Sequence, residues 1–261
     1  ALNHLTDQAV LDHQEAFRAG LPRNALGYDP RRETLGKPEP FTEEEIVNFR
    51  SPSACDLWGR PALELLDIED FHAIASRVIG DFHLMDLTMN AGFTPKPFRW
   101  GFHRDHGPWI EPDSPRTDYL WYFCILDDFP AESGGTWVVP GSHRMRADDK
   151  AYWDIHHDPS SDLYPSKMQV NAKASDVLIV NPNTLHAAGF NYTDKPRRAM
   201  NMRLGARRPY AYPPHIRHYD DLDDRLKDGL PERVARMLQT DFAQDRSYPV
   251  PRKRIVLESA L

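Results

Sequence analysis

The pattern of hydrophobic and polar positions divides the chain into helical ends and a β-rich middle. Hydrophobic residues recur at helical spacing from Leu5 to Phe17, and again from Asp67 to Ile79, where Gly80 is the expected C-cap. A further helix is predicted from Leu230 to Phe242, with proline at a tolerated first-turn position. The stretch Thr42–Glu45 matches a capping box, which is typical of a helix start.

Between these ends, short segments rich in β-branched and aromatic residues are separated by Gly, Pro, Asn and Asp. Several short strands at this spacing are typical of a sandwich or a small barrel. The predicted strands are Phe82–Met89, Phe98–Asp105, Tyr119–Leu126, Thr136–Val139, Met168–Ala172, Val177–Val180 and Arg198–Leu204. We therefore expect one mainly β domain over residues 1–261, with a β core at about 80–206 and helical flanks.

Composition narrows the class of protein. The 261 residues include 32 Lys+Arg and 39 Asp+Glu, a net charge of −7, which argues against nucleic-acid or polybasic membrane binding. The longest apolar run, Leu120–Leu126, is far shorter than the ~20 residues of a membrane helix. Two distant cysteines form no disulfide framework, and no signal peptide is visible. We expect a cytoplasmic monomer or homodimer with a small-molecule substrate.

A metal-binding pattern closes one of the predicted strands. His103 and Asp105 flank Arg104, and side chains alternate along a strand, so the imidazole and the carboxylate share a face. His186, which follows a later strand and an Asn-Pro-Asn turn, is the best placed third ligand. Two His and one carboxylate are the donor set of non-haem Fe(II) oxygenases, which keep positions open for a 2-oxo acid and dioxygen.

Taken alone, an H-x-D tripeptide also fits a solvated His–acid pair. The stretch His156-His157-Asp158 has the same composition in a Pro/Ser/Asp-rich loop, and we interpret it as surface. Pro140–His143 contains a further histidine, but Pro and Gly there indicate a tight structural turn and not a metal ligand.

Two longer segments carry a resemblance to a known family. Residues 126–144 contain an acidic pair, Ser-Gly-Gly, a short strand and Pro-Gly-Ser-His, and resemble the hallmark of the phytanoyl-CoA dioxygenase family. Residues 186–197 resemble that family's distal segment, with His, Asn, Pro and Arg in order. The resemblance covers about residues 80–206. It implies a double-stranded β-helix core of the jelly-roll, cupin-like type and an Fe(II)/2-oxoglutarate-dependent dioxygenase that consumes O2.

By this resemblance His103, Asp105 and His186 are the catalytic iron ligands, and Arg197 binds the distal carboxylate of 2-oxoglutarate. A planar guanidinium suits this role because it can donate two charge-assisted hydrogen bonds to a carboxylate. Arg198 is the rival for the role. We expect it on the opposite strand face with Met200, Met202 and Leu204, which pack on other elements, whereas Arg197 shares a face with Ala199, Asn201 and Arg203.

Three further positions are candidate cosubstrate contacts. Phe123 falls where many relatives have Trp beside the cosubstrate, although a core aromatic stripe explains it equally well. Thr88 and Asn90 lie on the strand where relatives place a polar contact. Ala188 stands where relatives frequently have Ser, so a hydroxyl that would assist Arg197 is missing, and Thr88 or Asn90 is expected to replace it.

Several features bear on the reaction and the substrate. A halogenating relative would lack the carboxylate of Asp105, so hydroxylation or a related oxidation is expected. Arg104, Trp121 and Arg203 are weak candidates for substrate contacts and favour a small polar or acidic metabolite, for example of natural-product or specialised metabolism. Pairing of these arginines with surface acids is the open alternative. A fatty acyl-CoA oxygenase and a non-catalytic binding protein of the same family also remain open.

Overall fold

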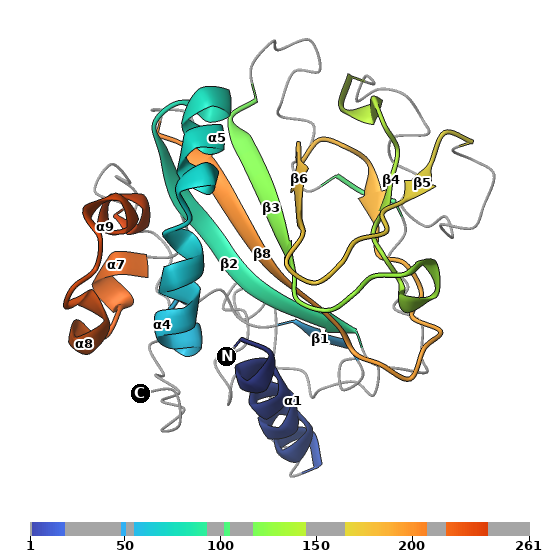
Figure 1. The fold of residues 1–261 in the computed structure, drawn as a ribbon, viewed down its shortest axis with the longest axis horizontal. Coiled ribbons are helices and arrows are strands. Elements are labelled where there is room, and N and C mark those ends of the chain that lie inside the picture. The colour runs from blue at the N-terminus through green and yellow to red at the C-terminus, as the bar shows by residue number, and fades with distance from the viewer. Residues whose placement is uncertain are drawn as a thin grey trace, which may run out of the picture.

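The computed structural model describes residues 2–18, 48–50, 55–92, 102–104, 117–144, 165–207 and 218–239. Helices lie mainly towards the two ends and strands in the middle, as the sequence predicts (Figure 1). The elements are α1 (Leu2–Arg18), β1 (Asn48–Arg50), α4 (Cys55–Leu66), α5 (Glu69–Ile79), β2 (Phe82–Gly92), β3 (Tyr119–Ile125), η2 (Ala131–Ser133), β4 (Trp137–Val138), η3 (Ser142–Arg144), β5 (Met168–Gln169), β6 (Val177–Val180), β7 (His186–Ala187), β8 (Arg197–Ala206), α7 (His218–Asp221), α8 (Asp224–Lys227) and α9 (Glu232–Leu238).

The strands form two antiparallel sheets. The larger sheet has the order β1-β2-β8-β3-β6, and the smaller has the order β5-β4-β7. Trp121 on β3 contacts His186 on β7, so the inner faces of the two sheets meet. Figure 1 shows the C-terminal helices and α4 on one side of the larger sheet and β4 and β5 on the other. Two facing antiparallel sheets are the arrangement of a jelly roll, and the predicted mainly β fold with flanking helices is confirmed.

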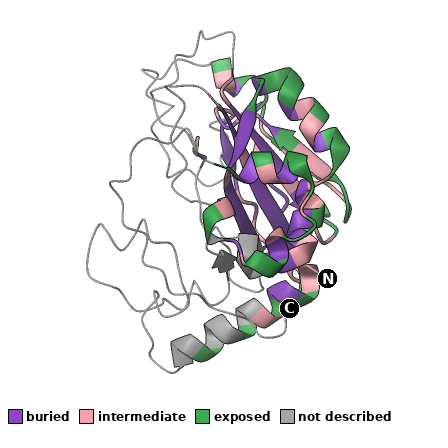
Figure 2. Ribbon diagram, turned by 90° about the vertical axis from the view of Figure 1, so that its left-hand side faces the viewer, coloured by how far each residue is buried: buried purple, intermediate pink, exposed green. Residues whose placement is uncertain are grey.

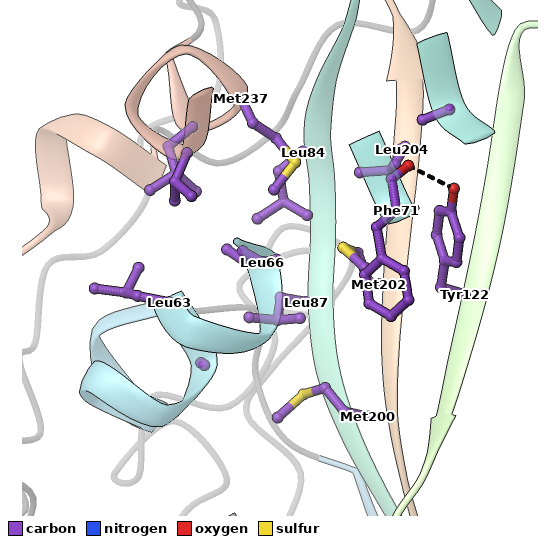
Figure 3. Packing of buried hydrophobic residues seen from close by; sticks show 14 of the residues in the cluster. Leu63, Leu66, Phe71, Leu84, Leu87, Tyr122, Met200, Met202, Leu204 and Met237 are labelled. Atoms are coloured by element: carbon purple, nitrogen blue, oxygen red, sulfur yellow. Dashed lines mark hydrogen bonds between the residues drawn. The ribbon is translucent and has the colours of Figure 1, made fainter. Parts of the chain in front are cut away.

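The face of the larger sheet that is covered by helices is hydrophobic. Met200, Met202 and Leu204 of β8 are fully buried in one cluster with residues of α4, α5 and α9 (Figure 3). The Tyr122 hydroxyl on β3 donates to the carbonyl oxygen of Phe71 at 2.9 Å, and burial raises the pKa of Tyr122 to about 12. Figure 2 shows these strands buried, while the covering helices are exposed along their outer sides. Burial of this face drives the packing of helices on the sheet.

Most predicted elements are present with shifted ends. The helix predicted over Asp67–Ile79 begins two residues later as α5, and Gly80, with a φ of 81°, ends it as predicted. The C-terminal helix is shorter than the predicted range 230–242, because Gln239 adopts extended backbone and α9 ends at Leu238. The predicted capping box lies outside the described residues. Over the described ranges, no helix is long and apolar enough to cross a membrane.

Sequence patterns did not predict α4, β1 or β7. In α4, Pro61 and a Gly59 with a φ of 60° interrupt the helical pattern, and the helix is kinked there. The strands β1 and β7 have only 3 and 2 residues. Strands so short show no alternation that could be recognised in a sequence. The omission of β7 is the most consequential, because this strand contains His186.

Arg198 anchors α1 to the sheet through a cluster of hydrogen bonds. Its Nε and Nη2 donate to the two carboxylate oxygens of Asp127 at 2.8 and 2.7 Å, and its Nη1 donates to Asp7 of α1 at 2.7 Å. The hydrogen bonds with Asp127 raise the pKa of Arg198, although burial opposes this. The guanidinium is therefore fully engaged in joining β8, the β3–η2 loop and α1, which is a structural role.

We expect Arg198→Ala to lower the free energy of unfolding by about 2–3 kcal/mol, because it removes a bidentate partner from a largely buried carboxylate. Urea denaturation followed by circular dichroism measures the change. Arg233→Ala is the matched control, since its pair with Asp67 lies on the surface and should contribute much less. Equal effects of the two substitutions would contradict the anchoring role of Arg198.

Candidate metal and cosubstrate site

Two histidines predicted as metal ligands lie side by side. His103 and His186 form an isolated antiparallel bridge, with backbone hydrogen bonds of 2.9 and 3.0 Å in the two directions. Their ring centroids are 4.4 Å apart, and the ring planes are inclined by 51°. The bridge brings two segments that are distant in sequence to one point on the inner face of the smaller sheet, next to β7. Both imidazoles are therefore close enough to share one metal ion.

The orientation of the His186 ring is fixed by a hydrogen bond. Its Nδ1 lies 2.8 Å from the carbonyl oxygen of Thr184, which can only accept, so Nδ1 carries the proton. The neutral ring then presents an unprotonated Nε2, the state that a metal ligand requires. The residues on either side of His186, Leu185 and Ala187, pack with Phe102 and Val139 in a small hydrophobic cluster. The sequence around His186 thus buries its neighbours and directs the imidazole into the space between the sheets.

The Pro-Gly-Ser-His stretch, residues 140–143, holds the turn that precedes His186. Gly141 adopts a φ of 81°, which favours glycine, and places Ser142 in the short helix η3. The Ser142 hydroxyl oxygen accepts a hydrogen bond from the backbone nitrogen of Leu185 at 2.7 Å. This contact holds the residue that precedes His186. The geometry agrees with the structural interpretation of residues 140–143.

The third predicted ligand, Asp105, lies outside the described residues, as does most of the strand predicted over residues 98–105. The described part of that segment is Phe102 to Arg104, which carries His103 on the bridge. Within the described residues, no three His, Cys, Asp or Glu side chains gather as a metal site. The histidine pair is therefore the part of the predicted triad that the structure places.

Arg197 is a half-buried cation at the start of β8. Its Nε donates to the carbonyl oxygen of Gly134 at 2.8 Å, and its guanidinium lies 4.9 Å from the centre of the Phe129 ring. Among the described residues no carboxylate pairs with it, in contrast to Arg198. Burial lowers the pKa of Arg197 to about 10, which still leaves the group charged at neutral pH. A desolvated cation without an anion is an anion-binding group.

The glycines beside Arg197 allow two loops to pass very closely. A Cβ at Gly134, where φ is 84°, would lie 2.7 Å from the backbone oxygen of Gly189. A Cβ at Gly135 would lie 2.2 Å from the backbone oxygen of Val170. Only glycine fits these positions, so the Ser-Gly-Gly motif brings the Gly134 carbonyl to Arg197.

Polar side chains occupy the inner face of the larger sheet. Along β8 this face carries Arg197 and Asn201, and the strand register places Thr88 of β2 opposite Asn201 and Asn90 opposite Ala199. Thr88 and Asn201 are buried, and neither the Thr88 hydroxyl nor the Asn201 amide oxygen has a hydrogen-bond partner in the described structure. Buried polar atoms without partners are costly, and at a functional site they are typically satisfied by a ligand.

Aromatic side chains connect this face to the histidines. The Trp121 ring meets the His186 ring edge-on, with centroids 5.2 Å apart. It also meets the Phe123 ring edge-on at 5.2 Å. Phe123 also packs with Ile125 and Ala199 in a hydrophobic cluster. The two explanations of Phe123, a core residue and a residue of the site, are therefore compatible. Trp121, a candidate substrate contact, therefore lies directly against a candidate metal ligand.

The two arginines proposed as substrate contacts both have partners within the chain. Nη1 of Arg203 lies 3.3 Å from Oδ2 of Asp86, and its guanidinium lies over the Trp121 ring at 4.4 Å. Arg104 donates from Nη1 to the carbonyl oxygen of Asn183 at 2.8 Å. The acid that pairs with Arg203 is buried and not a surface residue.

Sequence reasoning missed Asp86 and Asn201 as residues of this site. The available signal was a single carboxylate inside an apolar predicted strand for Asp86, and a shared strand face with Arg197 for Asn201.

The donor set that the structure assembles suits a metal ion and an anionic cosubstrate. Neutral imidazole is the commonest nitrogen ligand for iron and zinc, and a carboxylate completes a facial triad. The half-buried Arg197 cation and the unpartnered hydroxyl of Thr88 supply hydrogen-bond donors for an acid on the adjoining sheet. The arrangement can therefore hold a metal between the sheets and a carboxylate beside it.

Comparison with known proteins gives relatives of the same kind. The chain is 30% identical over 153 residues to "Dioxygenase aneA" of Aspergillus aculeatus, a match that covers 55% of this chain and 48% of that protein. It is 31% identical over 161 residues to "Dioxygenase andF" of Emericella variicolor, with coverage of 57% and 52%. The chain thus matches about half the length of these curated relatives.

The fold also has a counterpart among solved structures. HygX from Streptomyces hygroscopicus, crystallised with nickel and 2-oxoglutarate bound, superposes with a TM-score of 0.51 at 17% identity. The superposition covers 68% of this chain and 77% of HygX. The likeness concerns the fold, and it agrees with the jelly-roll core that the two facing sheets indicate.

The sequence profile of one family spans most of the chain. The profile described as "Phytanoyl-CoA dioxygenase (PhyH)" matches residues 9–199, a range that includes both histidines, the Ser-Gly-Gly and Pro-Gly-Ser-His motifs and Arg197. In the structure the two histidines bridge each other, Ser142 holds the residue before His186, and the Gly134 carbonyl oxygen accepts a hydrogen bond from Arg197. The chain belongs to the phytanoyl-CoA dioxygenase family.

Proposed function

We propose that this chain is an Fe(II)- and 2-oxoglutarate-dependent dioxygenase that hydroxylates a small polar or acidic metabolite. The observation that carries the proposal is the contact between the His103 and His186 rings, together with Arg197 on a strand of the facing sheet, a desolvated cation with no acid partner among the described residues. Membership of the phytanoyl-CoA dioxygenase family and the dioxygenase names of aneA and andF support it.

In this proposal His103 and His186 bind the metal through imidazole nitrogens, and Asp105 supplies the carboxylate. A bound iron would supply the oxidation of the substrate by O2, coupled to conversion of 2-oxoglutarate to succinate and carbon dioxide. The protein contributes position and environment. The hydrogen bond to Thr184 directs Nδ1 of His186 to the carbonyl, so that Nε2 is the nitrogen that binds the metal, and the facing hydrophobic surfaces exclude water.

Arg197 binds the distal carboxylate of the cosubstrate in this scheme. Its Nε is held by the Gly134 carbonyl, and no hydrogen bond between described residues uses its Nη atoms, so these remain for a carboxylate. Desolvation lowers the pKa of Arg197, and an anion bound beside the guanidinium would stabilise its charged form. Because Ala188 offers no hydroxyl, Thr88 and Asn90 are the candidates for the second contact, and the Thr88 hydroxyl is buried without a hydrogen-bond partner in the described structure.

The polar character of the substrate is proposed from the residues around the histidine pair. Trp121 contributes a flat aromatic wall, while Arg203 and Arg104 contribute cationic groups. Both arginines already have partners in Asp86 and the Asn183 carbonyl, which favours a polar group over a strongly anionic one. A succinate-release screen with paired acids and neutral esters, after anaerobic loading with Fe(II), tests this part of the proposal.

We expect His103→Ala and His186→Ala to fold but to lose Fe(II) binding, because each removes one of three ligands. Anaerobic titration of the apo variants with Fe(II) measures affinity and stoichiometry. His143→Ala is the control and should bind Fe(II) like the wild type, because the structure places His143 in the supporting turn. Unchanged Fe(II) affinity in both ligand variants would overturn the assignment of the metal site.

Arg197→Ala should weaken 2-oxoglutarate binding by about 30- to 1000-fold. This corresponds to about 2–4 kcal/mol for a lost bidentate, charge-assisted contact in a desolvated site. The charge-transfer absorption of the anaerobic Fe(II) complex, titrated with 2-oxoglutarate, reports the dissociation constant. Arg198→Lys keeps a cation beside Asp127 and should change the constant little. If Arg198→Lys has the larger effect, the assignment of Arg197 is wrong.

Thr88→Val should weaken 2-oxoglutarate binding about fivefold, the loss of one neutral hydrogen bond of ~1 kcal/mol at constant shape. The same titration measures it. Asn90→Ala serves as the comparison, because Asn90 is the other residue that could replace the missing hydroxyl at Ala188. A larger loss in Asn90→Ala than in Thr88→Val would transfer the role to Asn90.

A further inference from the structure

Three side chains form one row across the inner face of the larger sheet and end at His186. The register places Asp86 of β2 opposite Arg203 of β8, and Arg203 opposite Trp121 of β3. The Asp86 carboxylate lies 3.3 Å from the Arg203 guanidinium, which lies 4.4 Å from the centre of the Trp121 ring. Trp121 then meets the His186 ring edge-on at 5.2 Å. The contacts are continuous from the second strand of the sheet to a candidate metal ligand.

This row is not what packing alone would select. The side chains of Asp86 and Arg203 are 7% and 16% exposed, so this largely buried ion pair stands at a position where apolar residues would avoid the desolvation cost. On the other face of the same three strands, the neighbouring positions are Leu87, Met202 and Tyr122, which pack in the hydrophobic core. The charged pair is retained specifically on the face that carries the site, which indicates a function there.

The geometry of the row restricts the Trp121 ring. A planar guanidinium stacks on the indole face, and the ion pair with Asp86 fixes the guanidinium in turn. The edge contact with Phe123 leaves the indole little freedom to rotate. His186 is then constrained on two sides, by the Thr184 carbonyl at Nδ1 and by the Trp121 ring at its edge.

We propose that Asp86, Arg203 and Trp121 are positioning residues that hold the His186 imidazole in the orientation that binds Fe(II). The inference rests on the proposed function, since it takes His186 as a metal ligand. Residues that orient a metal-ligating histidine are expected to contribute 10- to 100-fold to metal affinity. The row begins at Asp86 on β2, a strand with no candidate metal ligand among the described residues, and ends at His186.

Titration of the apo protein with Co(II), which reports ligand geometry by its visible absorption, and anaerobically with Fe(II), tests the inference. Trp121→Leu should lower the affinity for both metals by about tenfold or more and change the Co(II) spectrum. Trp121→Phe, which keeps an aromatic ring, should retain most of the affinity. Asp86→Asn, an isosteric change, should weaken binding in the wild-type background. In the Trp121→Leu background, Asp86→Asn should cause no further loss of metal affinity, because Asp86 acts through Trp121.

Tyr122→Phe is the matched control on the same strand. It removes the hydrogen bond to the Phe71 carbonyl on the opposite face, so it should lower the melting temperature without moving the Co(II) affinity or spectrum. Unchanged Co(II) affinity and spectrum in Trp121→Leu would overturn the inference, as would equal losses from Asp86→Asn in the two backgrounds. Wild-type protein that binds neither metal would overturn the proposed function itself and, with it, this inference.

Discussion

The pairing of β8 between β2 and β3 is the constraint on which the rest of the structure depends. Side chains alternate along a strand, so the central position of β8 gives the sheet one face for the helices and one for the site. Met200, Met202 and Leu204 enter the core, while Asn201 and Arg203 enter the space between the sheets. A slip of one residue would exchange the two sets and turn two polar groups towards the hydrophobic residues of the covering helices.

The smaller sheet depends on contacts that are local and sterically demanding. The His103–His186 bridge joins a segment with little other described structure to the two-residue strand β7. So short a strand is not stable alone, and its position follows from its surroundings: the Ser142 contact to Leu185 and the close approach of Gly134 to Gly189. The motif residues of the family therefore serve mainly to place β7 against β3.

The sequence predicted those parts of the site that depend on local periodicity or on contiguous motifs. Arg197 and Arg198 differ in face because alternation along one strand is a local property, and the structure agrees in giving Arg198 two carboxylate partners and Arg197 none among the described residues. The histidine pair was predictable from motif order. The core strands were predictable from their β-branched and aromatic content.

Contacts that depend on register between distant strands were not predictable. The ladder between β2 and β8 shifts between Leu84 and Asp86, so that Leu84 faces the helices although it lies an even number of residues from Asp86 and Thr88. Simple alternation would place Leu84 on the same face as Asp86. Because of this break, the ion pair between Asp86 and Arg203 cannot be predicted from the alternation of side chains along one strand.

The two arginines on the inner face of β8 show how charge is distributed over the site. Arg203 is neutralised within the chain by Asp86, whereas Arg197 has no acid partner among the described residues. In the proposed site, Fe(II), the Asp105 carboxylate and the Arg197 cation would together carry a net positive charge that a dianion such as 2-oxoglutarate would balance. Without Asp86, a further buried cation would remain beside the metal, opposing its binding and attracting a second anion. On the proposed function, the ion pair would leave the inner face with charge for one dianionic ligand while preserving a guanidinium over the Trp121 ring.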